Sequence, residues 1–134
     1  MAAFMTGLAP QTHALLRLVA GLLFLCHGGQ KLLGYPVAMP EGVTMNPMLY
    51  TAGAIELVGG LLVMVGLFTR WAAFLCSGLM AAAYWMAHGT NALFPIANGG
   101  EPAALYCFVF LFLSARGPGI WSVDASRSGA PAPA

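Results

Sequence analysis

The apolar stretch of residues 48–68 most constrains the fold, because a single charged side chain, Glu56, interrupts it. A helix of about 20 apolar residues crosses the ~30 Å hydrocarbon core of a bilayer. The whole chain has a similar character, since 60% of its residues are hydrophobic and 7% are charged, whereas soluble domains carry roughly 25% charged residues. The sequence therefore predicts a small integral membrane protein and disfavours a soluble domain.

Four apolar segments can be distinguished along the chain. Residues 15–33, 48–68 and 71–87 form the first three, and the fourth, 102–115, is short for a span. We extend the fourth to 100–116, because an odd number of spans would place the two ends of the chain on opposite sides. The sequence thus predicts an all-α fold, an integral membrane four-helix bundle with a single domain over residues 1–124.

The basic residues predict the orientation of this bundle. Arg17, Arg70, Arg116 and Arg127 fall on one side of the four-span arrangement, and Lys31 falls near the other. The positive-inside rule then places both termini in the cytoplasm, and we expect the protein in the bacterial cytoplasmic (inner) membrane. Residues 125–134 are small and proline-rich with little to bury, so we expect a disordered tail.

Several partner and cofactor classes are not supported by the sequence. A formal net charge of +1 provides no basic surface for nucleic acid. The three cysteines lie in apolar helices without metal-ligand spacing, and neither Gly-Gly pair has the pattern of a phosphate loop. We expect His27 and His88 to differ in depth by more than a helical turn, which disfavours a haem held between them. Haem, metal and nucleotide are therefore not predicted.

Helical geometry predicts a cluster of polar side chains. At about 100° per residue, Arg17 and Lys31 share one face of the first helix, and His27 flanks that face. Glu56 shares its face with glycines that allow close helix packing, so it points into the bundle. We expect five ionisable side chains around one outward-opening cavity and Arg17 alone at the inner end; the five are His27, Lys31, Glu56, His88 and Glu101. Ionisable groups within a membrane mark functional sites.

Two interpretations of this cluster remain open from the side chains alone. A quinone head group has two carbonyl oxygens that need hydrogen-bond donors, and it takes up two protons on reduction, which suits His, Lys and Glu. Other polar ligands would suit them as well. In the second interpretation Glu56 pairs with Lys31 or His27 and fixes the register of two helices.

Several sequence blocks, taken in order, resemble the DoxX family. They are Leu15-Leu16-Arg17, Gly21, Phe24, His27-Gly28, Lys31-Leu32 and Gly34, then Glu56 with residues 59–60 and 66–70, then His88 with residues 98–101, and finally residues 117–124. The resemblance covers residues 15–124 and implies a four-helix membrane protein. It also implies a site at Arg17, His27, Lys31, Glu56, His88 and Glu101. The loop after Gly34 departs from the family pattern, since it is short and contains Met and Pro.

The resemblance implies a quinone-linked function, because members are similar to the small subunit of a thiosulfate:quinone oxidoreductase and to membrane components of oxidoreductase complexes. We expect a membrane subunit of such a complex, in which His27 and Lys31 bind a quinone carbonyl and Glu56 exchanges a proton, with His88 and Glu101 as a relay. No redox centre is visible in the sequence, so electrons would come from a partner or from the substrate, and whether the chain alone is an enzyme stays open.

Two other functions are kept as alternatives. One is a non-catalytic anchor or assembly subunit of a larger complex, in which the polar cluster holds the helices together. The other, which we rank last, is a carrier for a small solute or a lipid. In every case the surroundings are the lipid bilayer, and we expect either protein partners or self-association.

Overall fold

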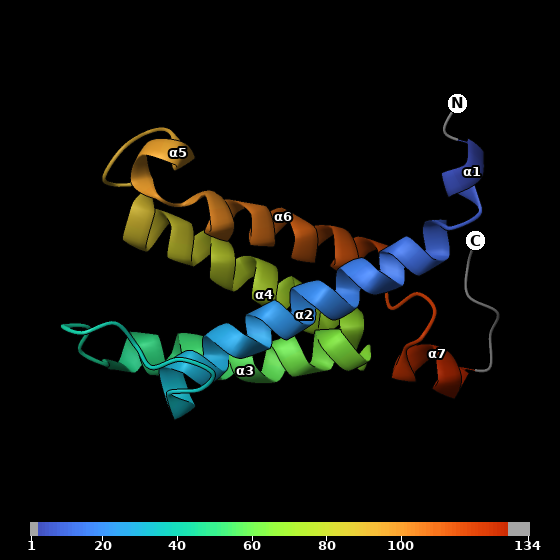
Figure 1. Ribbon diagram of the computed structural model, residues 1–134, viewed down its shortest axis with the longest axis horizontal. Helices are drawn as coiled ribbons and strands as arrows, with labels where there is room; N and C mark the ends of the chain where they lie inside the picture. Colours follow the sequence, from blue (N-terminus) through green and yellow to red (C-terminus); the bar gives the residue numbers. More distant parts are fainter. Residues whose placement is uncertain (1–2, 129–134) are drawn as a thin grey trace.

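The computed structural model describes residues 3–128, and within that range it contains helices and loops but no strand (Figure 1). The prediction of an all-α fold is confirmed. The helices are α1 (Ala3–Thr6), α2 (Ala9–Leu33), α3 (Pro47–Val65), α4 (Thr69–Ala83), the π-helical turn η1 (Tyr84–His88), α5 (Pro95–Asn98), α6 (Glu101–Arg116) and α7 (Val123–Ser128).

The helix boundaries follow from local sequence. Helix α2 begins six residues earlier than predicted, with Pro10 in its first turn, where a missing backbone N–H costs nothing. Helix α3 begins at Pro47 behind Asn46, whose side chain accepts a hydrogen bond from the N–H of Leu49, and it ends where Gly66 turns left-handed at φ 72°. The predicted segments 15–33, 48–68, 71–87 and 100–116 all correspond to helices.

The C-terminal segment differs from the expectation of disorder. Residues 125–128 belong to α7, because the hydroxyl of Ser122 accepts a hydrogen bond from the N–H of Ala125 and caps this short helix. Residues 129–134 lie outside the described part of the chain, so the expected tail there stays a prediction.

The longer helices form two packed pairs (Figure 1). Helix α2 lies along α3, and α4 lies along α6, while α3 and α4 join the two pairs through the tight turn at residues 66–68. Helices α2 and α6 barely touch, which leaves a seam between the pairs. Helices α1 and α7 lie at one end of the molecule, and α5 lies at the opposite end.

Glycines set the close approach of α2 and α3. A Cβ atom added to Gly21 would lie 2.5 Å from the backbone nitrogen of Met64, and one added to Gly60 would lie 2.5 Å from that of Leu25. One added to Gly28 would collide with the backbone of Leu57. Backbone therefore packs directly on backbone, as in membrane helix pairs joined by small residues.

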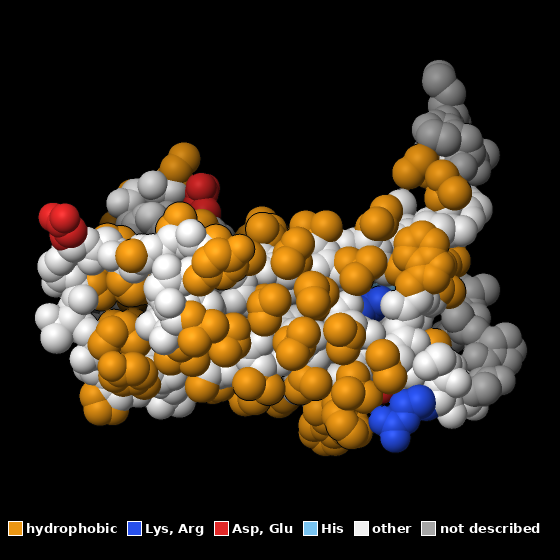
Figure 2. Space-filling model, turned by 60° about the horizontal axis from the view of Figure 1, so that its bottom comes forward, with side chains coloured by type: hydrophobic (Ala, Val, Ile, Leu, Met, Phe, Trp, Pro, Cys, Tyr) orange, Lys and Arg blue, Asp and Glu red, His pale blue; other side chains and the backbone are white. Residues whose placement is uncertain are grey.

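The surface of the molecule suits lipid. Helices α2 and α3 are long and apolar enough to cross a membrane, and in each only 28% of the most apolar window is buried inside the molecule. A core helix of a soluble protein would be mostly buried instead. Figure 2 shows hydrophobic side chains over the middle of the molecule and charged ones toward its ends, which is the distribution that a bilayer requires.

Two arginines close one end of the molecule by capping helices. The buried guanidinium of Arg17 donates to the carbonyls of Val63 and Met64 at the end of α3, and also to that of Trp121 at 2.7 Å. Arg70 likewise donates to the carbonyl oxygens of Ser114 and Ala115 near the end of α6. The last carbonyls of a helix have no partner within it, so both arginines supply donors where they are needed.

Candidate functional site

A cavity of about 200 Å³ lies at the α5 end of the seam between the helix pairs. Residues from α2, α3, α4, η1 and α6 contribute to its wall, which is partly open. It is lined by Phe24, His27, Glu56, Met80, Ala83, His88, Gly99, Pro102, Ala103 and Tyr106. Three of the predicted site residues, His27, Glu56 and His88, therefore share one cavity.

Glu56 is paired rather than isolated. Its Oε2 lies 2.6 Å from Nζ of Lys31, and the residue is only 4% exposed. Because an unpaired buried carboxylate is strongly destabilising, this ion pair is what allows Glu56 to face the cavity. Lys31 does not line the cavity itself, so its influence on a ligand there passes through Glu56.

The second histidine, His88, is held by the loop that follows it. Nδ1 of His88 lies 3.0 Å from the backbone oxygen of Asn98, and because a carbonyl can only accept, Nδ1 carries the proton. The other nitrogen, Nε2, is then an acceptor in the neutral ring. His88 ends the π-helical turn η1, an irregularity that is frequent at functional sites.

His27 and His88 line the same cavity, and the expected difference in depth between them stays a prediction. The π-helical turn moves His88 from the position that it would have on a regular α-helix. The haem prediction does not change, because about 200 Å³ is below the ~300–1,000 Å³ of pockets that enclose drug-sized ligands.

An aromatic wall of the cavity was missed from the sequence. Tyr106 stacks on Phe110 with ring centroids 5.8 Å apart and meets Phe24 at 5.7 Å. The ring of His27 stands edge-on to Tyr106 at 6.4 Å. Phe108 and Phe112 of the same helix are instead exposed. Tyr106 is the one tyrosine of the fourth apolar segment. A polar aromatic side chain in such a segment is the sequence feature that could have indicated this part of the cavity.

Two predicted site residues are not part of this cluster. Glu101 is exposed at the first position of α6, where a carboxylate favours the helix N-terminus, and only its neighbours Pro102 and Ala103 reach the cavity. Arg17 was correctly expected away from the other five, but its guanidinium caps α3 instead of facing a ligand site. The site is therefore smaller than the sequence suggested.

Comparisons with known proteins identify the family of this chain. A family model described as DoxX matches residues 12–89. The chain belongs to the DoxX family. The matched region includes His27, Lys31, Glu56 and His88 and ends before Tyr106. Together with its two long apolar helices, membership identifies this chain as a DoxX-family membrane protein.

A bacterial relative extends the similarity over most of the chain. A protein of Haemophilus influenzae (strain ATCC 51907 / DSM 11121 / KW20 / Rd), described as "Uncharacterized protein", is 45% identical over 120 residues, which covers 86% of this chain and 90% of the relative. No solved structure matches the chain significantly. The relative supports the DoxX assignment and names no activity.

Proposed function

We propose that this DoxX-family protein is a membrane subunit of a quinone-linked oxidoreductase complex and that its cavity holds a quinone head group. The proposal is carried by one observation: a buried, ion-paired glutamate, two histidines and a tyrosine ring line a single cavity between apolar helices. An intramembrane carboxylate beside proton-exchanging side chains is typical of proton-handling sites.

The size and lining of the cavity fit a substituted six-membered ring. A protein cavity of about 150 Å³ binds benzene, so about 200 Å³ leaves room for small ring substituents and none for a long tail. Phe24 and Tyr106 provide flat apolar contact, and the ring nitrogens of His27 together with the hydroxyl of Tyr106 provide donors for carbonyl oxygens. A bound quinone would supply two-electron, two-proton redox chemistry.

The residues of the chain then have separate roles. His27 and Tyr106 orient the head group, and Glu56 exchanges protons at the cavity wall. Lys31, expected from the sequence to contact the ligand, instead holds the Glu56 side chain in place through its 2.6 Å contact. Nε2 of His88 is an acceptor for a second proton. Electrons come from a partner protein or from a substrate outside this chain.

We further propose four membrane spans with both termini in the cytoplasm of a bacterium. Helix α4 continues into η1, and residues 69–88 together extend about 30 Å as a helix. Helix α6 has 16 residues and reaches only about 24 Å, so the bilayer would thin around it. Arg70 and Arg116 lie at the end where α1 and α7 lie, which supports that end as the cytoplasmic one.

The test is quinone retention by the protein purified in mild detergent from its native membrane. We expect near-stoichiometric quinone in the organic extract of wild type and loss of most of it from Glu56→Gln. The matched control is Glu101→Gln, the same chemical change at an exposed carboxylate outside the cavity, and it should retain quinone.

A second variant separates ligand loss from unfolding. His27 is exposed and is not needed for the ion pair, so His27→Leu should leave the fold intact and still lose quinone. Absence of quinone from folded wild type, or equal retention by all variants, would contradict the proposed site.

One observation favours the alternative of a non-catalytic anchor or assembly subunit. The 2.6 Å contact between Lys31 and Glu56 already satisfies both charges and joins α2 to α3, which is what a purely structural pair would do. In that case Glu56→Gln should weaken the fold or the association with partner proteins, and no preparation should contain quinone.

A further inference from the structure

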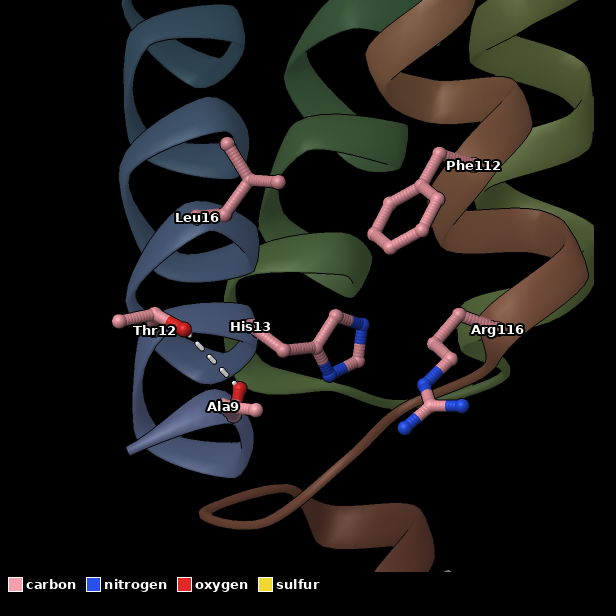
Figure 3. A pocket seen from close by; sticks show the side chains of 6 residues that line it. All are labelled: Ala9, Thr12, His13, Leu16, Phe112 and Arg116. Atoms are coloured by element: carbon pink, nitrogen blue, oxygen red, sulfur yellow. Dashed lines mark hydrogen bonds between the residues drawn. The ribbon is translucent and has the colours of Figure 1, made fainter. Parts of the chain in front are cut away.

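A second cavity lies at the other end of the seam between α2 and α6, and the proposed function leaves it without a role. Its volume is about 430 Å³, and it is lined by Ala9, Thr12, His13, Leu16, Phe112 and Arg116 (Figure 3). Helix α2 supplies four of these residues and α6 supplies two. The cavity therefore lies where α2 and α6, the outer helices of the two pairs, are not closely packed.

One part of the cavity is polar and cationic. Figure 3 shows the ring of His13 extending from α2 toward α6, with the guanidinium of Arg116 beside it near the helix ends. Nε2 of His13 is buried and has no hydrogen-bond partner among the described residues. A buried ring nitrogen without a partner is costly, and a ligand oxygen at this position would satisfy it. Both side chains can donate hydrogen bonds to an anion.

The other part is apolar and lies about one turn further from the helix ends. The side chains of Leu16 and Phe112 face each other across the gap (Figure 3), and they are 40% and 50% exposed. Phe112 also stands edge-on to His13, with ring centroids 5.9 Å apart. A ligand here would thus meet the Arg116 cation and the His13 ring at one end and hydrocarbon at the other.

We propose that this cavity binds an anionic phospholipid, with the phosphate at His13 and Arg116 and an acyl chain beside Leu16 and Phe112. Basic pockets between membrane helices near the cytoplasmic surface are suited to anionic head groups. A free phosphate ion would share the polar contacts, but it would leave the apolar half of the cavity without a partner. The amphiphilic lining therefore favours the lipid.

The experiment is a lipid titration of the purified full-length protein in detergent, read by native mass spectrometry. Phosphatidylglycerol should bind wild type at least several-fold more tightly than phosphatidylcholine. Arg116→Gln should bind phosphatidylglycerol about fivefold more weakly, since one cation near an anionic lipid contributes roughly that factor. Arg127→Gln, which removes the same charge from α7 at the same end, should bind as wild type does.

Two further measurements distinguish a lipid from a soluble anion and test the role of His13. His13→Leu keeps a bulky side chain but removes the ring nitrogens, and it should also weaken phosphatidylglycerol binding. Inorganic phosphate at millimolar concentration should displace little lipid. Equal affinity for both lipids, or unchanged binding by both site variants, would overturn the proposal, and full displacement by inorganic phosphate would reassign the cavity to a soluble anion.

Discussion

The ion pair between Lys31 and Glu56 gives the sharpest quantitative prediction. The pair joins α2 to α3 over 2.6 Å, and its side chains are 15% and 6% exposed. Removal of one partner of a buried pair typically costs about 3–5 kcal/mol of folding free energy. Glu56→Gln leaves the Lys31 ammonium beside a neutral amide, and because Lys31 retains some access to its surroundings, we expect a loss near the lower limit, about 3 kcal/mol.

The reasoning is tested by a double-mutant cycle in mixed micelles, with unfolding followed by circular dichroism. Lys31→Met alone should cost at least as much as Glu56→Gln, because it leaves the more deeply buried charge unpaired. The double variant should lose no more than about 1–2 kcal/mol, since neither charge remains. If the two single losses simply add in the double variant, the two groups do not stabilise each other and the account of the pair is refuted.

Three further predictions concern packing and caps. Gly28→Ala should destabilise by about 1–3 kcal/mol, because its Cβ would collide with the backbone of Leu57, whereas Gly78→Ala, with open space around it, should be neutral or stabilising in the same unfolding assay. Arg17→Lys should weaken the cap on α3 and its tie to Trp121 by about 2 kcal/mol and speed tryptic cleavage after Arg116. Burial raises the pKa of Asp124, but hydrogen bonds from the N–H groups of Thr69 and Phe68 outweigh it and hold that pKa below its usual value. The carboxylate therefore stabilises the fold above the unfolded pKa of 3.8, and this contribution is lost as the pH falls through the folded pKa. A scan of melting temperature against pH should show this acid loss in wild type and not in Asp124→Asn.

The fold was largely predictable because hydrophobic segments have few alternatives in a bilayer. A lipid-exposed backbone must satisfy its own hydrogen bonds, so each apolar segment became a helix close to its predicted bounds. The pairing of Glu56 with Lys31 could also be predicted, since helical geometry left Lys31 and His27 as the two possible partners. Local periodicity was sufficient for these features.

The remainder depended on contacts that periodicity does not contain. Nothing in the sequence near His88 indicates that the helix there widens into a π-turn. Tyr106 reaches the cavity because of how α6 packs on α4, which turns Phe108 outward. Asp124 caps the start of α4 from more than 50 residues away in the chain, and such partners become visible only in three dimensions.

The location of both cavities follows from how the two helix pairs are closed. At the end of the first pair, Arg17 of α2 caps α3, and the chain turns at Gly66 with φ 72°. At the end of the second, Arg70 of α4 caps α6, and the chain turns at Gly117 with φ 92°. The two helix pairs are therefore closed by corresponding contacts.

Two similar hairpins joined through α3 and α4 leave their outer helices, α2 and α6, facing each other without a connection. The α3–α4 side is held by the turn and by the Asp124 cap. The ring contacts described between α2 and α6 are those of His13 with Phe112 and His27 with Tyr106 toward the ends, and those of Phe24 with Tyr106 and Phe110 at the centre. Cavities therefore form above and below these central rings. If the seam is the reason that both sites exist, widening it by Phe110→Ala should alter quinone retention and lipid binding together, whereas independent sites would respond separately.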